Sequence, residues 1–269
     1  MEPDGALKIR FTTAERFLVF RYGWSNMPNK YPMMEWTDEN IKKFWDFECQ
    51  FPENYFTVTY GKMITNHVSR FLCAGSAVLD YGSGPGFLIP HLAKMHCDVY
   101  ALDFSSESVN KLNRFYKGDN HFKGAYTLDR LAEINKRFDV IMVVEVLEHL
   151  NDRYLEETIA AVKRLLKPEG VAVFTTPNEE DLSKSMVLCP QANVIFHRWQ
   201  HVRSWTEQTL RNYLSVRKLQ VLEVRALDFG KPLNHRPPLK MKIKTFVKKK
   251  LGIKESVVKN PHLIAITHL

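Results

Sequence analysis

The sequence predicts an α/β protein of the Rossmann-like class, with a seven-stranded, mostly parallel sheet covered by helices on both faces. Short apolar segments at 78–81, 99–103, 138–144 and 171–175 alternate with amphipathic helical segments. Such alternation is typical of strand–helix units that build a parallel sheet. A glycine-rich turn directly follows the first apolar segment, at the place where sheets of this class bind ligands.

Length and composition limit the class of protein. The 269 residues are enough for a sizeable core, and 45% hydrophobic with 25% charged residues excludes wholesale disorder. No apolar run approaches the roughly 18 residues of a membrane span. We also see no secretory signal, and the four cysteines lie far apart. We therefore expect free thiols and a cytoplasmic protein.

Residues 1–72 are predicted to form an N-terminal helical cap, ahead of a main domain at 73–269. In the cap, Thr37 is the expected N-cap of a helix over 38–48, and a second helix is expected over 57–72. In the main domain we expect helices over 88–96, from 105 onward, over 154–166 and over 207–214. A turn is expected at 168–170, a capping box at 204–207 and closing strands at 220–227 and 262–267.

The net charge of +8 is concentrated in one insert, at 230–260, before the last strand. Nine Lys and Arg, and no Asp or Glu, lie between 229 and 254, so the rest of the chain is nearly neutral. Within 239–254 the apolar residues repeat at helical spacing: Leu239, Ile243, Phe246, Val247 and Leu251. This pattern is typical of a basic amphipathic helix that binds an anionic membrane or another anionic partner. An ordinary surface helix with solvated lysines is the alternative.

Three glycines alternate in the turn after the first strand: Gly82, Gly84 and Gly86. Glycines at every second position let the chain turn tightly and approach a ligand closely. Asp80, just before them, disfavours a pyrophosphate, which helix N-terminal amides would bind, and favours a cationic or neutral ligand. Asp103 ends the next strand and suits a ribose diol, because a carboxylate accepts two hydrogen bonds.

From about Ala77 onward these motifs resemble the class I S-adenosylmethionine-dependent methyltransferases. The resemblance implies that the glycine loop lines the methionine part of the cofactor and that Asp103 binds its ribose. The family often has an acidic residue near the adenine. At that position this sequence has Thr127 and Leu128, and Asp129 follows them. The cofactor-binding residues that we expect are Asp80, Tyr81, Gly82, Ser83, Gly84, Gly86, Phe87, Asp103, Phe104, Thr127, Leu128 and Glu145.

A candidate metal site follows the strand at 138–144. Glu145, Glu148 and His149 are spaced to share one face of a helical turn, at the carboxyl end of that strand. Two carboxylates and an imidazole so close together repel one another or hold a divalent cation. His201, in the loop after the next strand, is the expected fourth ligand for Mg²⁺ or Mn²⁺. The alternative is that these residues only line the acceptor pocket.

The Glu-x-x-Glu-His motif is similar to that of the ubiquinone-biosynthesis O-methyltransferases and of the small-RNA 3′-terminal 2′-O-methyltransferases. The RNA enzymes also share a Thr-Pro-Asn, at 176–178 here, and a His–aromatic–Thr segment, at 201–206 here. The resemblance implies an acceptor with two adjacent hydroxyls, both held by the metal, which would lower the pKa of the attacking hydroxyl. Glu145, Glu148, His149 and His201 are the expected catalytic residues. His197 is a candidate general base, with a packing role as the alternative.

The sequence therefore predicts a metal-assisted, S-adenosylmethionine-dependent O-methyltransferase. The expected acceptor is a vicinal diol, such as a small or lipid-linked sugar of a glycan, glycolipid or natural product. The segment 239–254 would then place the enzyme at the inner face of a membrane. The alternatives are a quinone-pathway catechol O-methyltransferase and an RNA ribose 2′-O-methyltransferase whose lysines contact phosphates. A ligand-binding protein without catalysis is disfavoured by the intact glycine and acid motifs.

Overall fold

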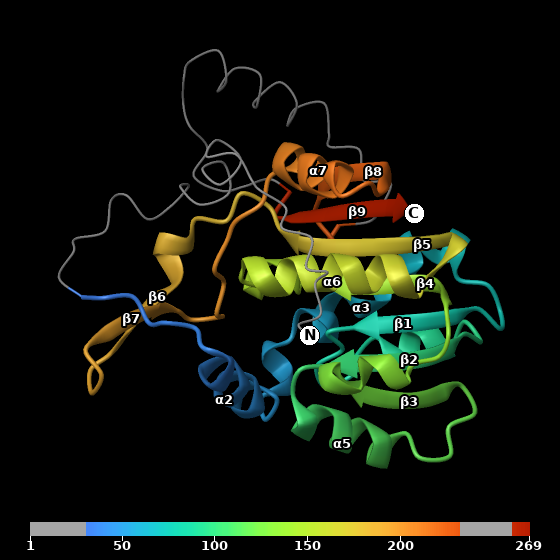
Figure 1. Ribbon diagram of the computed structural model, residues 1–269, viewed down its shortest axis with the longest axis horizontal. Coiled ribbons are helices and arrows are strands. Elements are labelled where there is room, and N and C mark those ends of the chain that lie inside the picture. The colour runs from blue at the N-terminus through green and yellow to red at the C-terminus, as the bar shows by residue number, and fades with distance from the viewer. Residues whose placement is uncertain (1–30, 232–259) are drawn as a thin grey trace, which may run out of the picture.

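The computed structural model of the protein describes residues 31–231 and 260–269. Its main sheet has seven strands in the order β3-β2-β1-β4-β5-β9-β8, with only β9 antiparallel to its neighbours (Figure 1). The strands are β1 (Ala77–Tyr81), β2 (Asp98–Asp103), β3 (Phe122–Thr127), β4 (Phe138–Val144), β5 (Leu166–Pro177), β8 (Gln220–Leu227) and β9 (His262–His268). The predicted Rossmann-like sheet is confirmed.

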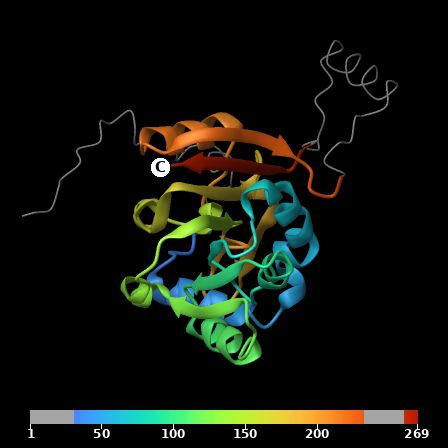
Figure 2. The same cartoon turned by 90° about the vertical axis from the view of Figure 1, so that its right-hand side faces the viewer.

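Helices cover both faces of this sheet (Figure 2). They are α2 (Asp38–Glu48), α3 (Phe56–His67), α4 (Ile89–Ala93), α5 (Ser106–Phe115), α6 (Asp152–Leu165) and α7 (Glu207–Val216). Short 3₁₀ turns lie at Pro52–Asn54, Ser69–Phe71, Leu128–Glu133, Leu147–His149 and Leu182–Ser185. The helices pack into two core clusters, one containing α6 and α7 and the other containing α3, α4 and α5.

Successive side chains of the central strands enter opposite clusters, as the period of a strand requires. Leu79 and Ile141 belong to the cluster with α6 and α7, whereas Val78 and Val140 belong to the cluster with α3 to α5. All four are almost completely buried. This explains why β1 and β4 are mostly apolar in the sequence, with Asp80 and Asp139 as their charged residues.

The described part of the N-terminal cap contains both predicted helices. Thr37 caps α2, since its hydroxyl accepts the N–H of Asn40 at 3.2 Å. The second helix, α3, ends at His67, earlier than predicted. Its Ile64 packs in the same core cluster as the sheet residue Val78, so α3 is part of the main body. Helix α2 lies apart from the sheet, beyond the carboxyl ends of the parallel strands (Figure 1).

Three local expectations differ from the structure. Residues 168–170 are not a turn but a bulge within β5, because the β4–β5 register shifts between Phe138 and Val140. The N-cap of α7 is Thr206, whose side chain and that of Thr209 exchange hydrogen bonds with each other's backbone N–H, so the predicted box at 204–207 is wrong. Helix α4 is also shorter than the predicted 88–96.

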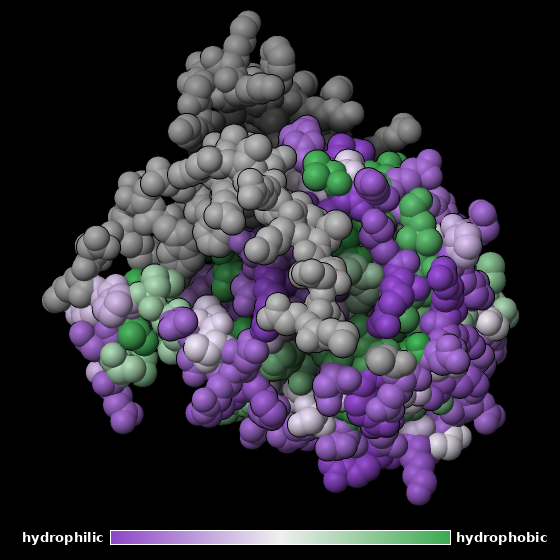
Figure 3. All heavy atoms as spheres, viewed as in Figure 1, coloured by the Kyte–Doolittle hydropathy of each residue, from purple (hydrophilic) through white to green (hydrophobic). Residues whose placement is uncertain are grey.

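A projecting hairpin was not predicted. Its strands are β6 (Met186–Cys189) and β7 (Val194–His197), and Met33 pairs with Ile195 at its edge. The face seen in Figure 3 is mainly hydrophilic, with apolar residues at this hairpin on the left and scattered over the right. His197 is the last residue of β7 and is buried.

The predicted basic insert falls largely outside the described residues, and the amphipathic segment at 239–254 does so entirely. Within 31–231 and 260–269, no helix is long and apolar enough to cross a membrane.

Candidate active site

The glycine loop after β1 has the backbone that its sequence predicts. Gly82, Gly84 and Gly86 all have positive φ angles, of 77°, 51° and 81°. A Cβ atom on Gly86 would lie 2.4 Å from Leu112 Cδ2, and one on Gly82 would lie 2.5 Å from Val146 Cγ2. Both the turn and the packing around it therefore require glycine.

We expect Gly86→Ala to destabilise the fold more than the matched change Gly118→Ala. Gly118 also has a positive φ, of 88°, but a Cβ atom there would meet no other group within 4 Å, so only the conformational cost of about 1–2 kcal/mol applies. Gly86→Ala adds a steric cost of about 1–3 kcal/mol. Denaturant unfolding measures both free energies, and equal losses would contradict the packing role of Gly86.

Two buried polar groups of the loop have no partner among the described residues. Asp80 is 2% exposed, and neither its Oδ2 nor the Ser83 hydroxyl makes a hydrogen bond. Burial, and then the charge of Asp103, raise the pKa of Asp80 to about 8. A buried carboxylate without a partner is unfavourable. A ligand that carries an ammonium group would supply the missing partner.

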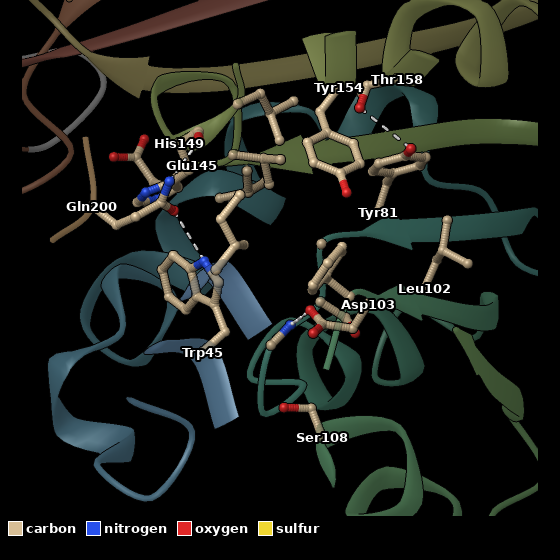
Figure 4. A pocket seen from close by; sticks show the side chains of 18 of the residues that line it. Trp45, Tyr81, Leu102, Asp103, Ser108, Glu145, His149, Tyr154, Thr158 and Gln200 are labelled. Atoms are coloured by element: carbon tan, nitrogen blue, oxygen red, sulfur yellow. Dashed lines mark hydrogen bonds between the residues drawn. The ribbon is translucent and has the colours of Figure 1, made fainter. Parts of the chain in front are cut away.

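Asp103 connects β2 to the glycine loop. Its Oδ2 accepts the N–H of Gly84 at 2.7 Å (Figure 4). Its Oδ1 accepts the N–H of Ser105 at 2.8 Å. Burial raises the pKa of Asp103, and these backbone hydrogen bonds oppose that rise. The carboxylate therefore lies beside the loop, at the carboxyl end of β2, as predicted for a ribose-binding residue.

A cavity of about 740 Å³ opens at the carboxyl ends of the parallel strands. Most of the predicted site residues line it, namely Asp80, Tyr81, Gly82, Ser83, Gly84, Asp103, Phe104, Leu128, Glu145, Glu148, His149 and His201. Gly86, Phe87, Thr127 and His197 are not among the lining residues, whereas Asp129 is. The cavity is large enough for a cofactor and a small acceptor together.

The cap closes one side of this cavity with residues that were not predicted. The indole N–H of Trp45 donates to Gln200 Oε1 at 3.1 Å, and its ring meets that of His149 edge-on at 4.8 Å between centroids. The side-chain amide of Gln200 also donates to the carbonyl of His149 at 2.9 Å, so it joins α2 to the loop after β4 (Figure 4). Tyr55 packs against Gly84. No local pattern in the sequence shows that α2 would fold over the strand ends.

The loop after β4 differs from the predicted helical turn. Glu145 has a φ of 52°, and only Leu147–His149 form a 3₁₀ turn, so Glu145 does not share a helical face with Glu148 and His149. Instead, Thr175 holds Glu145, since its hydroxyl donates to Oε1 at 2.8 Å. On the neighbouring residue of β5, the Thr176 hydroxyl donates to Glu148 Oε2 at 2.9 Å.

His201 reaches this loop because residues 200–203 run beside 148–152. The N–H of Val202 donates to the carbonyl of Glu148 at 2.8 Å, and the Arg203 guanidinium donates to the carbonyl of Leu150, also at 2.8 Å. Glu148, His149 and His201 consequently have ligand atoms within 4.8 Å of one another. Three of the four predicted metal ligands thus lie together, and Glu145 is not part of that group.

The electrostatics of this group fit a divalent cation. Burial, and then the charge of Glu145, raise the pKa of Glu148 well above its usual range. Burial raises the pKa of Glu145 itself to about 8. Burial, and then the charge of His201, hold the pKa of His149 well below its usual range. Glu148 Oε1 and His149 Nδ1 are buried without a partner. Neutral imidazoles beside buried carboxyl groups that lack a positive partner are a suitable set of ligands for a cation.

A second set of possible metal ligands shares His201 with the first set. It contains Glu180, which was not predicted. Glu180, His197 and His201 also have ligand atoms within 4.8 Å of one another. Burial would raise the pKa of Glu180, but the imidazole of His197, 3.5 Å away, and the hydrogen bond with His201 lower it to about 2. His197 is 1% exposed and stacks on His201, with 4.6 Å between ring centroids. His197 therefore contacts His201, not the cavity.

Comparisons with known proteins agree with this fold. The profile of the methyltransferase domain family matches residues 61–224, so the chain belongs to that family. A ubiquinone biosynthesis O-methyltransferase of Nitrosococcus oceani is 34% identical over 140 residues, which are 51% of this chain and 57% of the relative. The match thus spans little more than half the length of that relative.

Solved structures show the same fold. A SAM-dependent methyltransferase from Archaeoglobus fulgidus superposes with a TM-score of 0.57 at 15% identity, over 84% of this chain and 99% of that one. A Burkholderia thailandensis 1,6-didemethyltoxoflavin-N1-methyltransferase, solved with S-adenosylhomocysteine, gives 0.53 at 15% identity over 86% of each chain. The prediction of a class I S-adenosylmethionine-dependent methyltransferase is confirmed at the level of family and fold.

Proposed function

We propose that this protein transfers a methyl group from S-adenosylmethionine to the oxygen of an acceptor that carries two adjacent hydroxyls, with a divalent cation bound at Glu148, His149 and His201. One observation carries the proposal: this group, in which Glu148 Oε1 and His149 Nδ1 are buried without a hydrogen-bond partner, lines the same cavity as the glycine loop. A carboxylate–imidazole group at that place is suited to activate a hydroxyl beside the methyl donor.

At the cofactor end, the chain supplies binding and orientation. Asp80 and Ser83 would bind the ammonium group, because both have a buried oxygen without a partner. Asp103 would bind the ribose, and Leu128 and Asp129 lie along the cavity where the adenine is expected. Glu145 lines the same cavity and is a proposed cofactor contact. S-adenosylmethionine, when bound, supplies an electrophilic methyl group on a sulfonium.

At the acceptor end, Glu148, His149 and His201 would hold Mg²⁺ or Mn²⁺. The cation, when bound, lowers the pKa of a hydroxyl that coordinates it. Thr176 fixes one oxygen of Glu148 and leaves the other free for the cation. Gln200 fixes the backbone of His149. These contacts hold the ligands in place before substrate binds, which is how such a site accelerates an in-line transfer.

The acceptor that we propose first is a sugar-like vicinal diol, small or lipid-linked. A catechol is the second candidate, for two reasons. Trp45, whose ring lies against His149, offers a flat wall on which an aromatic ring can stack. The curated relative reported above is also named for ubiquinone biosynthesis. Both acceptors present the same pair of oxygens to a cation.

Chelation tests this proposal. We expect EDTA to abolish methyl transfer from labelled S-adenosylmethionine to a diol or catechol, and Mg²⁺ or Mn²⁺ to restore it. A catechol and the corresponding monophenol form a matched pair of acceptors, and so do a glycoside with a free cis-diol and its deoxy analogue. Only the member with two hydroxyls should be methylated. Full activity in EDTA, or equal rates for both members of a pair, would refute the role of the cation.

We also propose, from the sequence of 239–254, that the enzyme works at an anionic membrane surface. Each lysine near such a surface adds about 1 kcal/mol, screened over a Debye length of about 8 Å at physiological salt. We expect sedimentation with anionic but not zwitterionic liposomes, lost at high salt and in the triple variant with Lys248, Lys249 and Lys250 changed to Glu. A triple variant that loses affinity for RNA instead would support an RNA substrate.

A further inference from the structure

We infer that Glu180 is a positioning residue that fixes the ring of His201, so that His201 presents its Nε2 atom to the cation group of Glu148 and His149. The inference rests on the proposed function, because it assigns how one member of that group is oriented. Glu180 belongs to neither of the sequence motifs that predicted the site, and it reaches the site from the loop after β5.

The first observation is the contact between the two side chains. Glu180 Oε2 lies 2.5 Å from Nδ1 of His201. A carboxylate only accepts hydrogen bonds, so His201 must carry its proton on Nδ1 and donate it. Nε2 is then the unprotonated nitrogen, and it is the one left for the group with Glu148 and His149. Imidazoles that bind metals generally have their second nitrogen held in this way.

The second observation concerns the ring behind His201. The Nδ1 atom of His197 accepts the backbone N–H of His201 at 3.2 Å and that of Trp199 at 3.3 Å. Its proton must therefore be on Nε2, which lies 3.5 Å from Glu180 Oε1. The two imidazoles stack with an interplanar angle of 19°. The Glu180 carboxylate thus faces both rings, and His197 supports the plane of His201 from behind.

The third observation is that the two residues before Glu180 are anchored. The N–H of Glu179 donates to the carbonyl of Trp205 at 2.7 Å, and the Asn178 side chain donates to the carbonyl of Asn260 at 2.9 Å. Glu180 therefore extends from a segment that is fixed to β5 and to the chain next to β9. A carboxylate on such a support can set the orientation of a histidine ring, whereas one on a free loop could not.

The neighbouring Glu179 provides a matched control. It is exposed, has no side-chain hydrogen bond or ion pair among the described residues, and differs from Glu180 by one position. Glutamine at 180 keeps an oxygen that can accept the Nδ1 proton but loses the negative charge, whereas alanine loses both. A positioning role thus predicts graded effects at 180 and none at 179.

Mn²⁺ titrations of the full chain, followed by electron paramagnetic resonance with S-adenosylhomocysteine present, test the inference. We expect one Mn²⁺ per chain, with affinity lowered about tenfold by Glu180→Gln and about 100-fold by Glu180→Ala, and unchanged by Glu179→Gln. The affinity for S-adenosylhomocysteine should stay at the wild-type value in all three variants. The metal-free unfolding midpoint should stay unchanged in Glu179→Gln and should fall in Glu180→Ala, because His201 Nδ1 then loses its buried partner.

The other outcomes overturn it in different ways. Unchanged Mn²⁺ affinity in Glu180→Ala would refute the positioning role and leave the proposed function standing. Two Mn²⁺ per chain would show that Glu180, His197 and His201 bind a cation themselves. No Mn²⁺ binding by the wild-type chain would refute the cation of the proposed function and this inference with it. If Glu180→Ala does not fold, pulsed electron paramagnetic resonance of wild-type protein with Mn²⁺ decides. We expect directly bound nitrogens from two histidines. Nitrogens from three histidines would contradict the inference.

Discussion

Replacing Glu148 with glutamine should lower kcat by about 10²–10³-fold, the loss typical of removing one electrostatic group from an active site. The affinity for S-adenosylhomocysteine should stay within about twofold, because Glu148 lies at the acceptor end of the cavity. The physical reason is that Glu148 provides a buried, unpartnered Oε1 atom within the cation group. Single-turnover kinetics and calorimetry measure the two quantities separately.

The same substitution should not destabilise the metal-free protein. The folded-state pKa of Glu148 is raised well above its ordinary value, chiefly by burial. A group with a raised folded-state pKa favours the fold at low pH, and that contribution is lost as the pH rises through the folded-state pKa. At pH 8, Glu148→Gln should thus unfold at the same temperature as the wild type or a higher one. A lower midpoint would mean that the loss of kcat reflects damaged folding.

Binding of S-adenosylhomocysteine should release a proton near pH 7, and Asp80→Asn should abolish that release. The pKa of Asp80 is about 8 in the free protein, so its carboxyl is mostly protonated at pH 7, whereas pairing with an ammonium group requires the ionised form. The affinity of the wild type should therefore rise with pH up to about 8. Asp80→Asn should also weaken binding about 10- to 100-fold, because hydrogen bonds to charged groups contribute about 1.5–3 kcal/mol.

Calorimetry in two buffers with different ionisation enthalpies measures this proton release. Methylthioadenosine is the matched ligand, because it keeps the adenosine and the thioether but lacks the ammonium group. It should release no proton from the wild type, and Asp80→Asn should bind it about as well as the wild type does. Proton release with both ligands would contradict the pairing of Asp80 with the ammonium group.

Local sequence patterns were sufficient to predict the sheet and the cofactor loop. The strands β1 and β4 are mostly apolar because helices cover both of their faces. The glycines of the loop are needed for its positive φ angles and close packing. Within one strand–loop–helix unit, most residues interact with others that are near them in the chain. Spacing alone therefore located Asp80 and Asp103, and the cavity places both beside the glycine loop.

The acceptor end could be predicted only in part, because long-range contacts assemble it. His201 was identified from its motif, but the pairing of 200–203 with 148–152 that brings it to Glu148 has no local signal. Glu145 was wrongly expected in a helical turn, since nothing in the sequence indicates its left-handed backbone. Trp45, Gln200 and Glu180 were missed because each depends on how the cap or a distant loop folds onto the site.

A crystal structure of the full chain with S-adenosylhomocysteine and Mn²⁺ tests the central claim most directly. The claim is that one cavity holds the methyl donor at the glycine loop and a cation beside it. We predict cofactor density along Asp80 and Asp103, and an anomalous Mn²⁺ peak bound by Glu148, His149 and His201 Nε2, with Glu180 on the far side of the His201 ring. Bound S-adenosylhomocysteine with no Mn²⁺ peak among these residues would contradict the claim.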